Sequence, residues 1–192
     1  MIKITGFADE ISQDPREQTA TLKAENIRFL EFRAAWGKNV LALSAQELRE
    51  FRKMLDGEGL RVSAIGSPVG KIKISEPFEP ELARFKRSLE VADVMDAEWV
   101  RIFSYYPPDG GRIEEQREEV LRRMKLKVEA ARGSRARLFN ENESDLYGQS
   151  AENCLEIIRH AGGPRLLNSA STLPTSSTTD STPGRPGRCS PT

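Results

Sequence analysis

The sequence predicts an α/β fold, a parallel (β/α) barrel of the TIM type that is incomplete, with about five of the eight βα units. Short apolar runs alternate with amphipathic stretches five times, at intervals of roughly 25 to 38 residues, as expected for parallel strands joined by helices. Polar residues follow the apolar runs, whereas no Gly-rich phosphate turn follows the first run. These observations favour a barrel mouth over an open nucleotide-binding sheet.

Five apolar runs are the expected strands, and helix signals follow them. The runs are IKITGF, IRFLEFR, LRVSAIGS, EWVRIFSYY and ARLFNEN. Asp14 followed by Pro15 indicates the start of the first helix, and Ser44 with Glu47 predicts a capping box at the start of the second. The remaining helices are expected after Pro80, over about 114–132 and over about 150–161.

The composition changes sharply after residue 166. Of the 26 residues 167–192, 16 are Ser, Thr or Pro, and none is aromatic, Lys or Glu. Such a segment buries too little apolar area to offset its ordering entropy. We therefore expect a folded partial barrel over 1–166 and a disordered tail over 167–192.

Charge and cysteine patterns exclude several kinds of partner and site. The 29 Lys and Arg residues balance 29 Asp and Glu residues, so no basic field favours a nucleic acid or an anionic membrane. No stretch reaches about 18 consecutive apolar residues, and the first residues lack a signal-peptide pattern, which predicts a cytoplasmic location. Cys154 and Cys189 form no Cys-x-x-Cys pair, and the single histidine, His160, cannot build a histidine-rich metal site.

Four segments at the predicted strand ends carry a family resemblance: GFADEIS, LEFRAAWGKNVLALS, SAIGSPVGKIKI and FNENESDLYGQSAENCLEII. They resemble the xylose isomerase-like TIM barrels, in particular the sugar phosphate isomerase and epimerase branch, over residues 1–166. The resemblance implies an eight-stranded barrel that moves a proton alpha to the carbonyl of a small sugar or polyol. It also implies a divalent metal, for which Mg²⁺, Mn²⁺, Co²⁺ and Zn²⁺ are chemically suitable.

The resemblance implies that Glu141 is both a metal ligand and the catalytic carboxylate. The other three ligands of the family, an Asp, a His and a further acid, have no counterpart, so we expect this truncated chain to lose the metal and to be inactive. Glu31 and Arg33 are spaced i and i+2 on one side of a strand, where they either bind substrate or are structural, as a salt bridge or as two solvated charges. Lys71 is either a ligand for a substrate phosphate or carboxylate, or an ordinary surface lysine.

Two other functions fit parts of the sequence. A non-catalytic fragment would act in binding or assembly, with self-association through the open edges of its sheet. An apurinic endonuclease shares the barrel, but the single histidine and the absence of net positive charge argue against that activity.

The reading frame offers an explanation for the abrupt change near residue 166. In relatives, the helix that matches residues 152–161 leads into a strand like LRF-D-P-A-N-F with the Asp ligand, where this chain has LNSASTLPTSS. If the reading frame is displaced by one base, each new codon keeps two bases that this sequence constrains, and only its first base is free. Every position of F-D-P-A-N-F is compatible with the displaced codons.

We expect the genomic DNA downstream of the Arg165 codon to contain, in another frame, an Asp, a His and a late acid at barrel spacing. Sequencing a few hundred bases and translating all three frames tests this. If no frame continues the barrel, the frameshift hypothesis is wrong.

Overall fold

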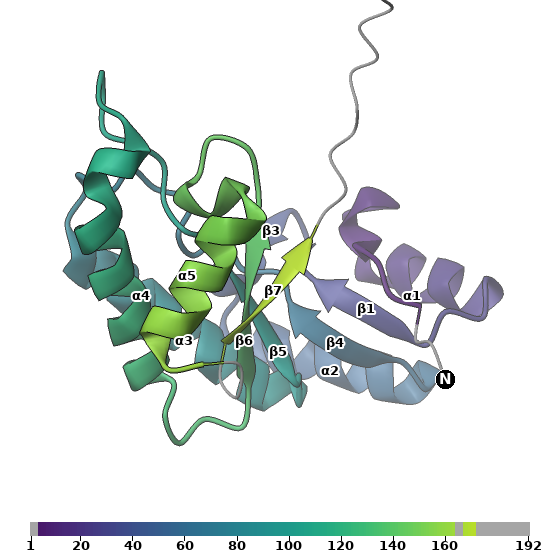
Figure 1. Cartoon of the computed structure of the whole chain (residues 1–192). Helices are drawn as coiled ribbons and strands as arrows, with labels where there is room; N and C mark the ends of the chain where they lie inside the picture. The colour runs from purple at the N-terminus through teal and green to yellow at the C-terminus, as the bar shows by residue number, and fades with distance from the viewer. Residues whose placement is uncertain (1–3, 164–166, 172–192) are drawn as a thin grey trace, which may run out of the picture.

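The computed structural model describes residues 4–163 and 167–171, whose long strands form a single curved parallel sheet (Figure 1). Its five strands neighbour one another in chain order, and every neighbouring pair is parallel. They are β1 (Phe29–Phe32), β4 (Arg61–Ile65), β5 (Trp99–Ile102), β6 (Arg137–Asn142) and β7 (Leu167–Ser171). Within the described residues the sheet ends at β1 and β7 instead of closing, which confirms the predicted incomplete parallel barrel.

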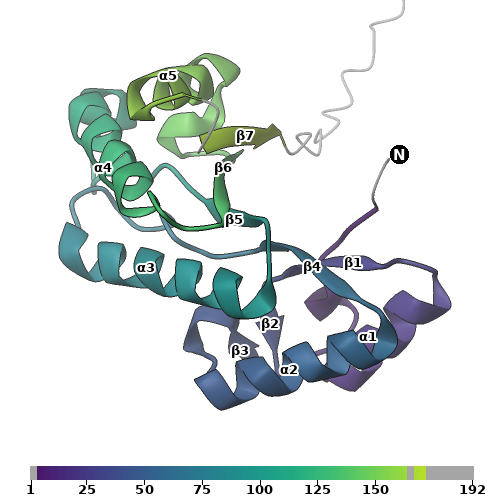
Figure 2. The same ribbon diagram turned by 90° about the horizontal axis from the view of Figure 1, so that it is seen from below.

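Helices follow the strands in the predicted alternation and lie together on one side of the sheet (Figure 2). They are α1 (Pro15–Ala24), α2 (Ala45–Glu58), α3 (Phe78–Met95), α4 (Arg117–Ala130) and α5 (Ala151–Ala161). Short 3-10 turns η1 (Ala8–Glu10), η2 (Val40–Ala42), η3 (Ile113–Gln116) and η4 (Tyr147–Gln149) and a hairpin of β2 (Ala34–Ala35) and β3 (Lys38–Asn39) complete the connections. Among the described helices, none is long and apolar enough to cross a membrane.

The two predicted helix starts are confirmed by their hydrogen bonds. The Asp14 side chain accepts from the backbone N–H of Arg16 at 2.9 Å, with Pro15 in the first helical position. Ser44 and Glu47 form a reciprocal capping box at the start of α2. These caps satisfy N–H groups that have no partner within the helix.

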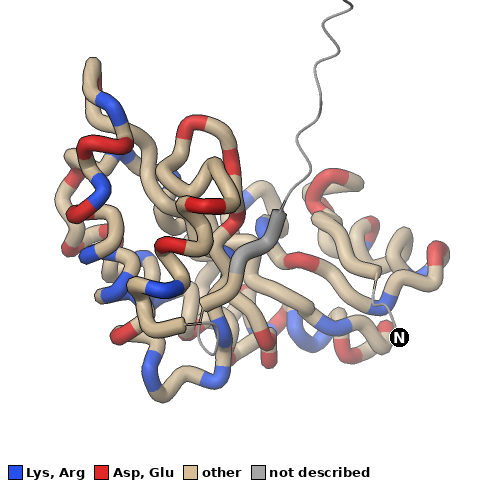
Figure 3. The backbone as a smooth tube through the Cα atoms, viewed as in Figure 1, with Lys and Arg blue, Asp and Glu red and all other residues tan. Residues whose placement is uncertain are grey.

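Alternation along the strands gives the sheet two different faces. Leu30, Phe32, Val100, Ile102 and Leu138 point to the helices and are at most 1% exposed. Their neighbours in sequence point away from the helices. We call this second side the open face; it carries Glu31, Arg61, Trp99, Arg101, Arg137, Phe139 and Glu141. Over the whole described chain, acidic and basic residues are interspersed (Figure 3).

The predicted first strand, IKITGF, is only partly realised. Residues 1–3 lie outside the described residues, and Phe7 forms an isolated parallel bridge to Glu31. The Gly6 carbonyl accepts from the Glu31 N–H at 2.9 Å. The chain turns into η1 directly after this contact.

The predicted boundary of the tail at residue 167 is wrong by at least five residues. Leu167–Ser171 forms β7, which pairs in parallel with β6. Strand pairing uses backbone N–H and C=O groups, so polar side chains do not prevent it. The side chain of Leu167 is also fully buried, and β7 contacts both α5 and β6. The rest of the predicted tail, 172–192, lies outside the described residues.

The loop after β4 is fixed by a close backbone approach to β5. Gly70 has φ +94°, and a Cβ placed there would lie 2.0 Å from the carbonyl oxygen of Phe103. The Phe103 N–H donates to Val69 O at 2.7 Å, and the Tyr105 N–H donates to Gly70 O at 3.0 Å. Only glycine fits this conformation and this contact.

A buried ion pair supports the same loop from the helix side. The Gly70 N–H donates to Glu81 Oε1 at 2.5 Å, and Lys127 Nζ lies 3.4 Å from the same oxygen. Both side chains are almost completely buried. Burial lowers the pKa of Lys127 to about 8, although Glu81 acts in the opposite direction. Helices α3 and α4 thereby fix the loop that presents Lys71.

Gly70→Ala should lower the free energy of unfolding by more than about 2 kcal/mol, because a backbone clash adds to the left-handed penalty. Urea denaturation followed by circular dichroism measures the difference. Gly110→Ala is the matched control, since Gly110 has φ +67° with nothing within 4 Å of a Cβ. Equal losses for both variants would contradict the close approach.

Candidate active site

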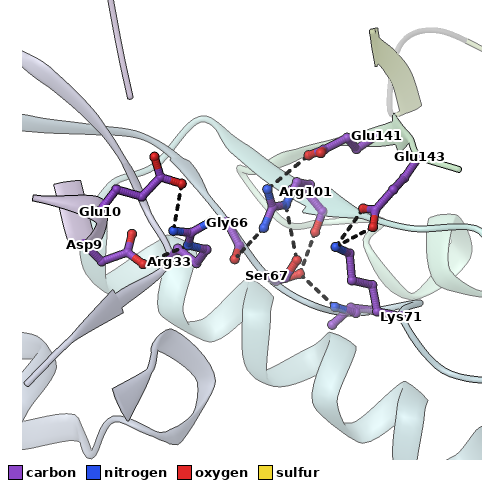
Figure 4. Close-up of polar contacts among 10 residues, drawn as sticks. Asp9, Glu10, Arg33, Gly66, Ser67, Lys71, Arg101, Glu141 and Glu143 are labelled. Atoms are coloured by element: carbon purple, nitrogen blue, oxygen red, sulfur yellow. Dashed lines mark hydrogen bonds and ion pairs between the residues drawn. The ribbon is translucent and has the colours of Figure 1, made fainter. Parts of the chain in front are cut away.

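The carboxyl ends of the strands bring together a group of charged side chains (Figure 4). We call it the mouth cluster; its members are Asp9, Glu10, Glu31, Arg33, Lys71, Arg101, Glu141 and Glu143. All four residues predicted for the site belong to it. The carboxyl end of a parallel barrel is where catalytic side chains from different strands converge.

Arg101 lies at the centre of this cluster and joins three consecutive strand ends. Its Nη1 donates to Glu141 Oε2 at 3.0 Å, and its Nη2 donates to Gly66 O at 3.2 Å. Ser67 Oγ donates to the Arg101 carbonyl at 2.5 Å. The side chains of Arg101 and Glu141 are only 7% and 15% exposed. This ion pair is therefore well shielded from solvent, and its geometry is fixed from β4, β5 and β6.

Two aromatic rings lie close to the Arg101 guanidinium. Its central carbon lies 5.0 Å from the ring centroid of Phe7 and 5.0 Å from that of Phe103. Planar guanidinium groups stack favourably on aromatic faces. The rings restrict the motion of Arg101 and keep it directed at Glu141.

The carboxyl group of Glu31 has a raised pKa. Burial raises the pKa of Glu31 above its usual value, and the negative charge of Glu141 raises it further. The positive charges of Arg101 and Arg33 act in the opposite direction but do not cancel the effect of burial. A carboxylate with a raised pKa exchanges protons more readily near neutral pH.

The two predicted substrate-binding cations lie on opposite flanks of Arg101. Arg33 Nε lies 2.8 Å from Asp9 Oδ2, and Arg33 Nη2 lies 3.2 Å from Glu10 Oε1. Arg33 thus forms ion pairs, but with residues of η1 and not with Glu31. Lys71 Nζ lies 2.7 Å from Glu143 Oε2. A substrate anion would have to compete with these carboxylates for either cation.

Arg101 lies within the predicted strand EWVRIFSYY, and the sequence alone assigned it no role. The available signal was a charged residue within the apolar run WVRIF. A buried arginine needs several acceptors, and the sequence does not show that the carbonyls of Gly66 and Ser67 lie within reach. Cys154 is buried on α5, and His160 is exposed near the end of the same helix.

The described residues do not fit a divalent metal. Within 4–163 and 167–171, no group of three or more His, Cys, Asp or Glu side chains could hold an ion. The one expected ligand, Glu141, is paired with the buried guanidinium of Arg101. A metal at Glu141 would place a second cation against that guanidinium and would leave it with fewer acceptors.

The family comparison bears directly on this arrangement. The model of the xylose isomerase-like TIM barrel family matches residues 20–167. The chain belongs to this family. No curated protein matches the sequence.

Solved structures of the xylose isomerase-like fold superpose on most of the chain. A D-tagatose 3-epimerase-like protein has a TM-score of 0.71 and 16% identity, with 88% of this chain and 64% of that chain covered. A family member from Mycobacterium smegmatis in complex with magnesium has a TM-score of 0.65 and 16% identity, with coverage of 87% and 63%. An AP endonuclease of family 2 from Brucella melitensis has a TM-score of 0.67 and 12% identity, with coverage of 90% and 68%.

These similarities show that the chain shares the fold of these proteins and matches only part of their length. The chain spans less than two thirds of the D-tagatose 3-epimerase-like and M. smegmatis proteins. At such low identity, the substrates and metals of the neighbours do not transfer directly to this chain.

Glu31→Gln should raise the free energy of unfolding at pH 7. The pKa of Glu31 is raised in the folded state, so the folded state loses stability as pH rises from the unfolded value of 4.5 through the folded value. A neutral amide removes this loss, and the gain should disappear below pH 4.5. Urea denaturation at several pH values measures it.

Glu50→Gln, at an exposed position of α2, is the matched control and should change stability by less than about 0.5 kcal/mol. A gain for Glu31→Gln that persists unchanged at low pH would contradict the assigned cause.

Proposed function

We propose that this chain carries part of an isomerase or epimerase site for a small sugar or polyol, and that the 192-residue chain alone does not turn over substrate. One observation carries the proposal: two carboxylates, Glu31 and Glu141, lie around one buried cation at the mouth of a barrel of this family. Structural neighbours that include a D-tagatose 3-epimerase-like protein support this kind of reaction.

The proposed chemistry is proton transfer alpha to a carbonyl. Glu141 takes the proton from carbon, the C–H electron pair forms an enediolate, and a proton returns to the neighbouring carbon or to the opposite face. Glu31, with its raised pKa, is suited to supply a proton near neutral pH. Arg101 is placed to stabilise the negative charge on the enediolate oxygen.

The flanking cations are proposed to bind the rest of the substrate. Lys71 would contact a phosphate or carboxylate after displacing Glu143, and Arg33 would contact hydroxyl groups on the other flank. A sugar phosphate is therefore a proposed substrate, and a cytoplasmic location accords with such a metabolite.

The proposed reaction would depend on a metal only if other residues, which the described part of the chain does not supply, completed the set of ligands. We expect no tight binding of Mg²⁺, Mn²⁺, Co²⁺ or Zn²⁺ by this chain, because the part of the chain that the structure describes has no group of three candidate ligands, and Glu141 faces Arg101. Isothermal titration with each metal chloride measures this directly. Stoichiometric micromolar binding would contradict it.

The activity test compares two chains on the same panel of ketoses, their phosphates and inososes. The 192-residue chain should give no product above a buffer blank, with or without added metal. A chain with the downstream frame restored should give product, and Glu141→Gln in that chain should reduce turnover by at least about 100-fold. Glu50→Gln is the control. Turnover by the 192-residue chain would disprove its inactivity, and an inactive restored chain would weigh against the proposed reaction.

DNA repair is the second candidate, because one neighbour is an AP endonuclease of family 2. The chain has no net charge and a single histidine, so phosphate binding has little electrostatic support. We expect no binding to a duplex with an abasic site at physiological salt in a fluorescence anisotropy titration. Saturable binding that is absent with an intact duplex would favour repair over isomerisation.

A further inference from the structure

The cations of the mouth cluster alternate with aromatic rings across the strand ends. The ring centroid of Phe7 lies 4.5 Å from the guanidinium carbon of Arg33 and 5.0 Å from that of Arg101. The ring centroid of Phe103 lies 5.0 Å from the guanidinium carbon of Arg101 and 4.5 Å from Lys71 Nζ. Cations are attracted to aromatic faces. The three cations therefore form a row, with a ring between each positive charge and the next (Figure 4).

The carboxylates that neutralise this row differ in how well they are shielded from water. Arg33 faces two carboxylates, and the side chain of one of them, Asp9, is only 7% exposed. The side chain of Glu141, which pairs with the central arginine, is 15% exposed. Lys71 and Glu143 are 35% and 32% exposed. Opening a shielded pair leaves a charge uncompensated, whereas opening an exposed pair costs little. A ligand can therefore open the pair of Lys71 and Glu143 most easily.

Two donors converge on the carboxylate of Glu143. Lys71 Nζ lies 2.9 Å from Oε1 and 2.7 Å from Oε2. The Tyr106 side chain is also hydrogen-bonded to Glu143. Burial raises the pKa of Tyr106, and the charges of Glu143 and Asp145 raise it further, so the hydroxyl keeps its proton and is the donor. A phosphate or carboxylate ligand offers the same kind of oxygen to an ammonium and a hydroxyl group.

The backbone fixes both donors in place. The Tyr105 N–H donates to Gly70 O at 3.0 Å. The Tyr106 N–H donates to Ile72 O at 2.9 Å. These bonds hold the loop on both sides of Lys71 and join it to the segment that carries Tyr106. The two donors are therefore pre-organised, which lowers the cost of binding an anion between them.

The acceptor, in contrast, lies just beyond the end of a strand. The ladder between β6 and β7 ends at Asn142 and Ser171, and Glu143 is the next residue of the chain. The Glu143 carbonyl accepts from the Leu146 N–H at 3.4 Å, which is longer than a typical backbone hydrogen bond. Rotation of the Glu143 side chain away from Lys71 breaks no pair of the sheet.

We propose that Glu143 is a tethered competitor for the charged group of the substrate. Its carboxylate neutralises Lys71 in the free chain, and a phosphate or carboxylate of the ligand displaces it to bind Lys71 and Tyr106. A neutral sugar cannot replace this carboxylate and gains nothing from the two donors, so Glu143 determines specificity for charged ligands. The inference rests on the proposed function, because it treats the mouth cluster as a substrate site.

The test is the binding of inorganic phosphate to the full 192-residue chain, followed by NMR with sodium chloride added to keep the ionic strength constant. Glu143→Gln should lower the phosphate Kd at least about fivefold, because it removes a competing acceptor and a like charge. In that variant, Lys71→Met should abolish the gain and Tyr106→Phe should reduce it. Glu58→Gln is the matched control, since Glu58 forms a similarly exposed pair with Lys23 at 2.6 Å, and it should leave the phosphate Kd unchanged.

A measurement on the unmodified chain keeps the test informative if Glu143→Gln fails to fold by circular dichroism. Saturating phosphate should shift the side-chain carboxyl ¹³C resonance of Glu143 and leave that of Glu58 in place. The proposal would be overturned by an unmoved Glu143 resonance, by an equal phosphate Kd with and without Glu143→Gln, by an equal gain in Glu58→Gln, or by a gain that survives Lys71→Met.

This outcome is separate from that of the proposed reaction, because phosphate binding requires no turnover. A restored chain that lacks activity would count against the reaction and would leave the role of Glu143 standing. Phosphate binding that ignores Glu143 would overturn the competitor and would leave the reaction open to its own test.

Discussion

The burial of the Arg101 guanidinium is the constraint on which the mouth of this barrel depends. Arginine keeps its proton at any ordinary pH, so a buried arginine must be given acceptors and a counter-charge. Gly66 and Ser67 supply carbonyl oxygens, and Glu141 supplies the carboxylate. Because these groups come from the loop after β4 and from β6, one side chain fixes three consecutive strand ends. The path of the loop toward Lys71 follows from the same contacts, assisted by the close approach of Gly70 to Phe103.

This constraint places the two central carboxylates in different environments. Glu141 is held by a hydrogen-bonded guanidinium, whereas Glu31 experiences the same cation without a direct contact and has a raised pKa. Carboxylates in unequal environments are the usual basis for one acid and one base in a single site. The ion pair between Glu141 and Arg101 also opposes metal binding, since Glu141 cannot coordinate a metal in its present position without weakening the interaction that keeps Arg101 buried.

Local signals in the sequence were sufficient for most of the fold. The caps at Asp14 and Ser44 and the alternation of apolar runs with helices depend on neighbouring residues, and the structure confirms them. Strand β7 could not be predicted, because its pairing depends on the backbone of β6 and on burial of Leu167. The contacts of Arg101 were hidden for the same reason: its acceptors are main-chain carbonyls more than 30 residues away in sequence. Strand-end positions were sufficient to place Glu31 and Glu141 in the candidate site, but not to show that the buried cation Arg101 lies near them.

The alternation that builds the mouth cluster also determines how the open face must be covered. A strand that directs Leu138 and Asn140 toward the helices directs Arg137, Phe139 and Glu141 away from them. The aromatic rings and the carboxylate of Glu141 therefore share one surface, and no rearrangement of side chains separates them. Further strands of a barrel would cover the rings and leave the mouth open, because they continue around the axis.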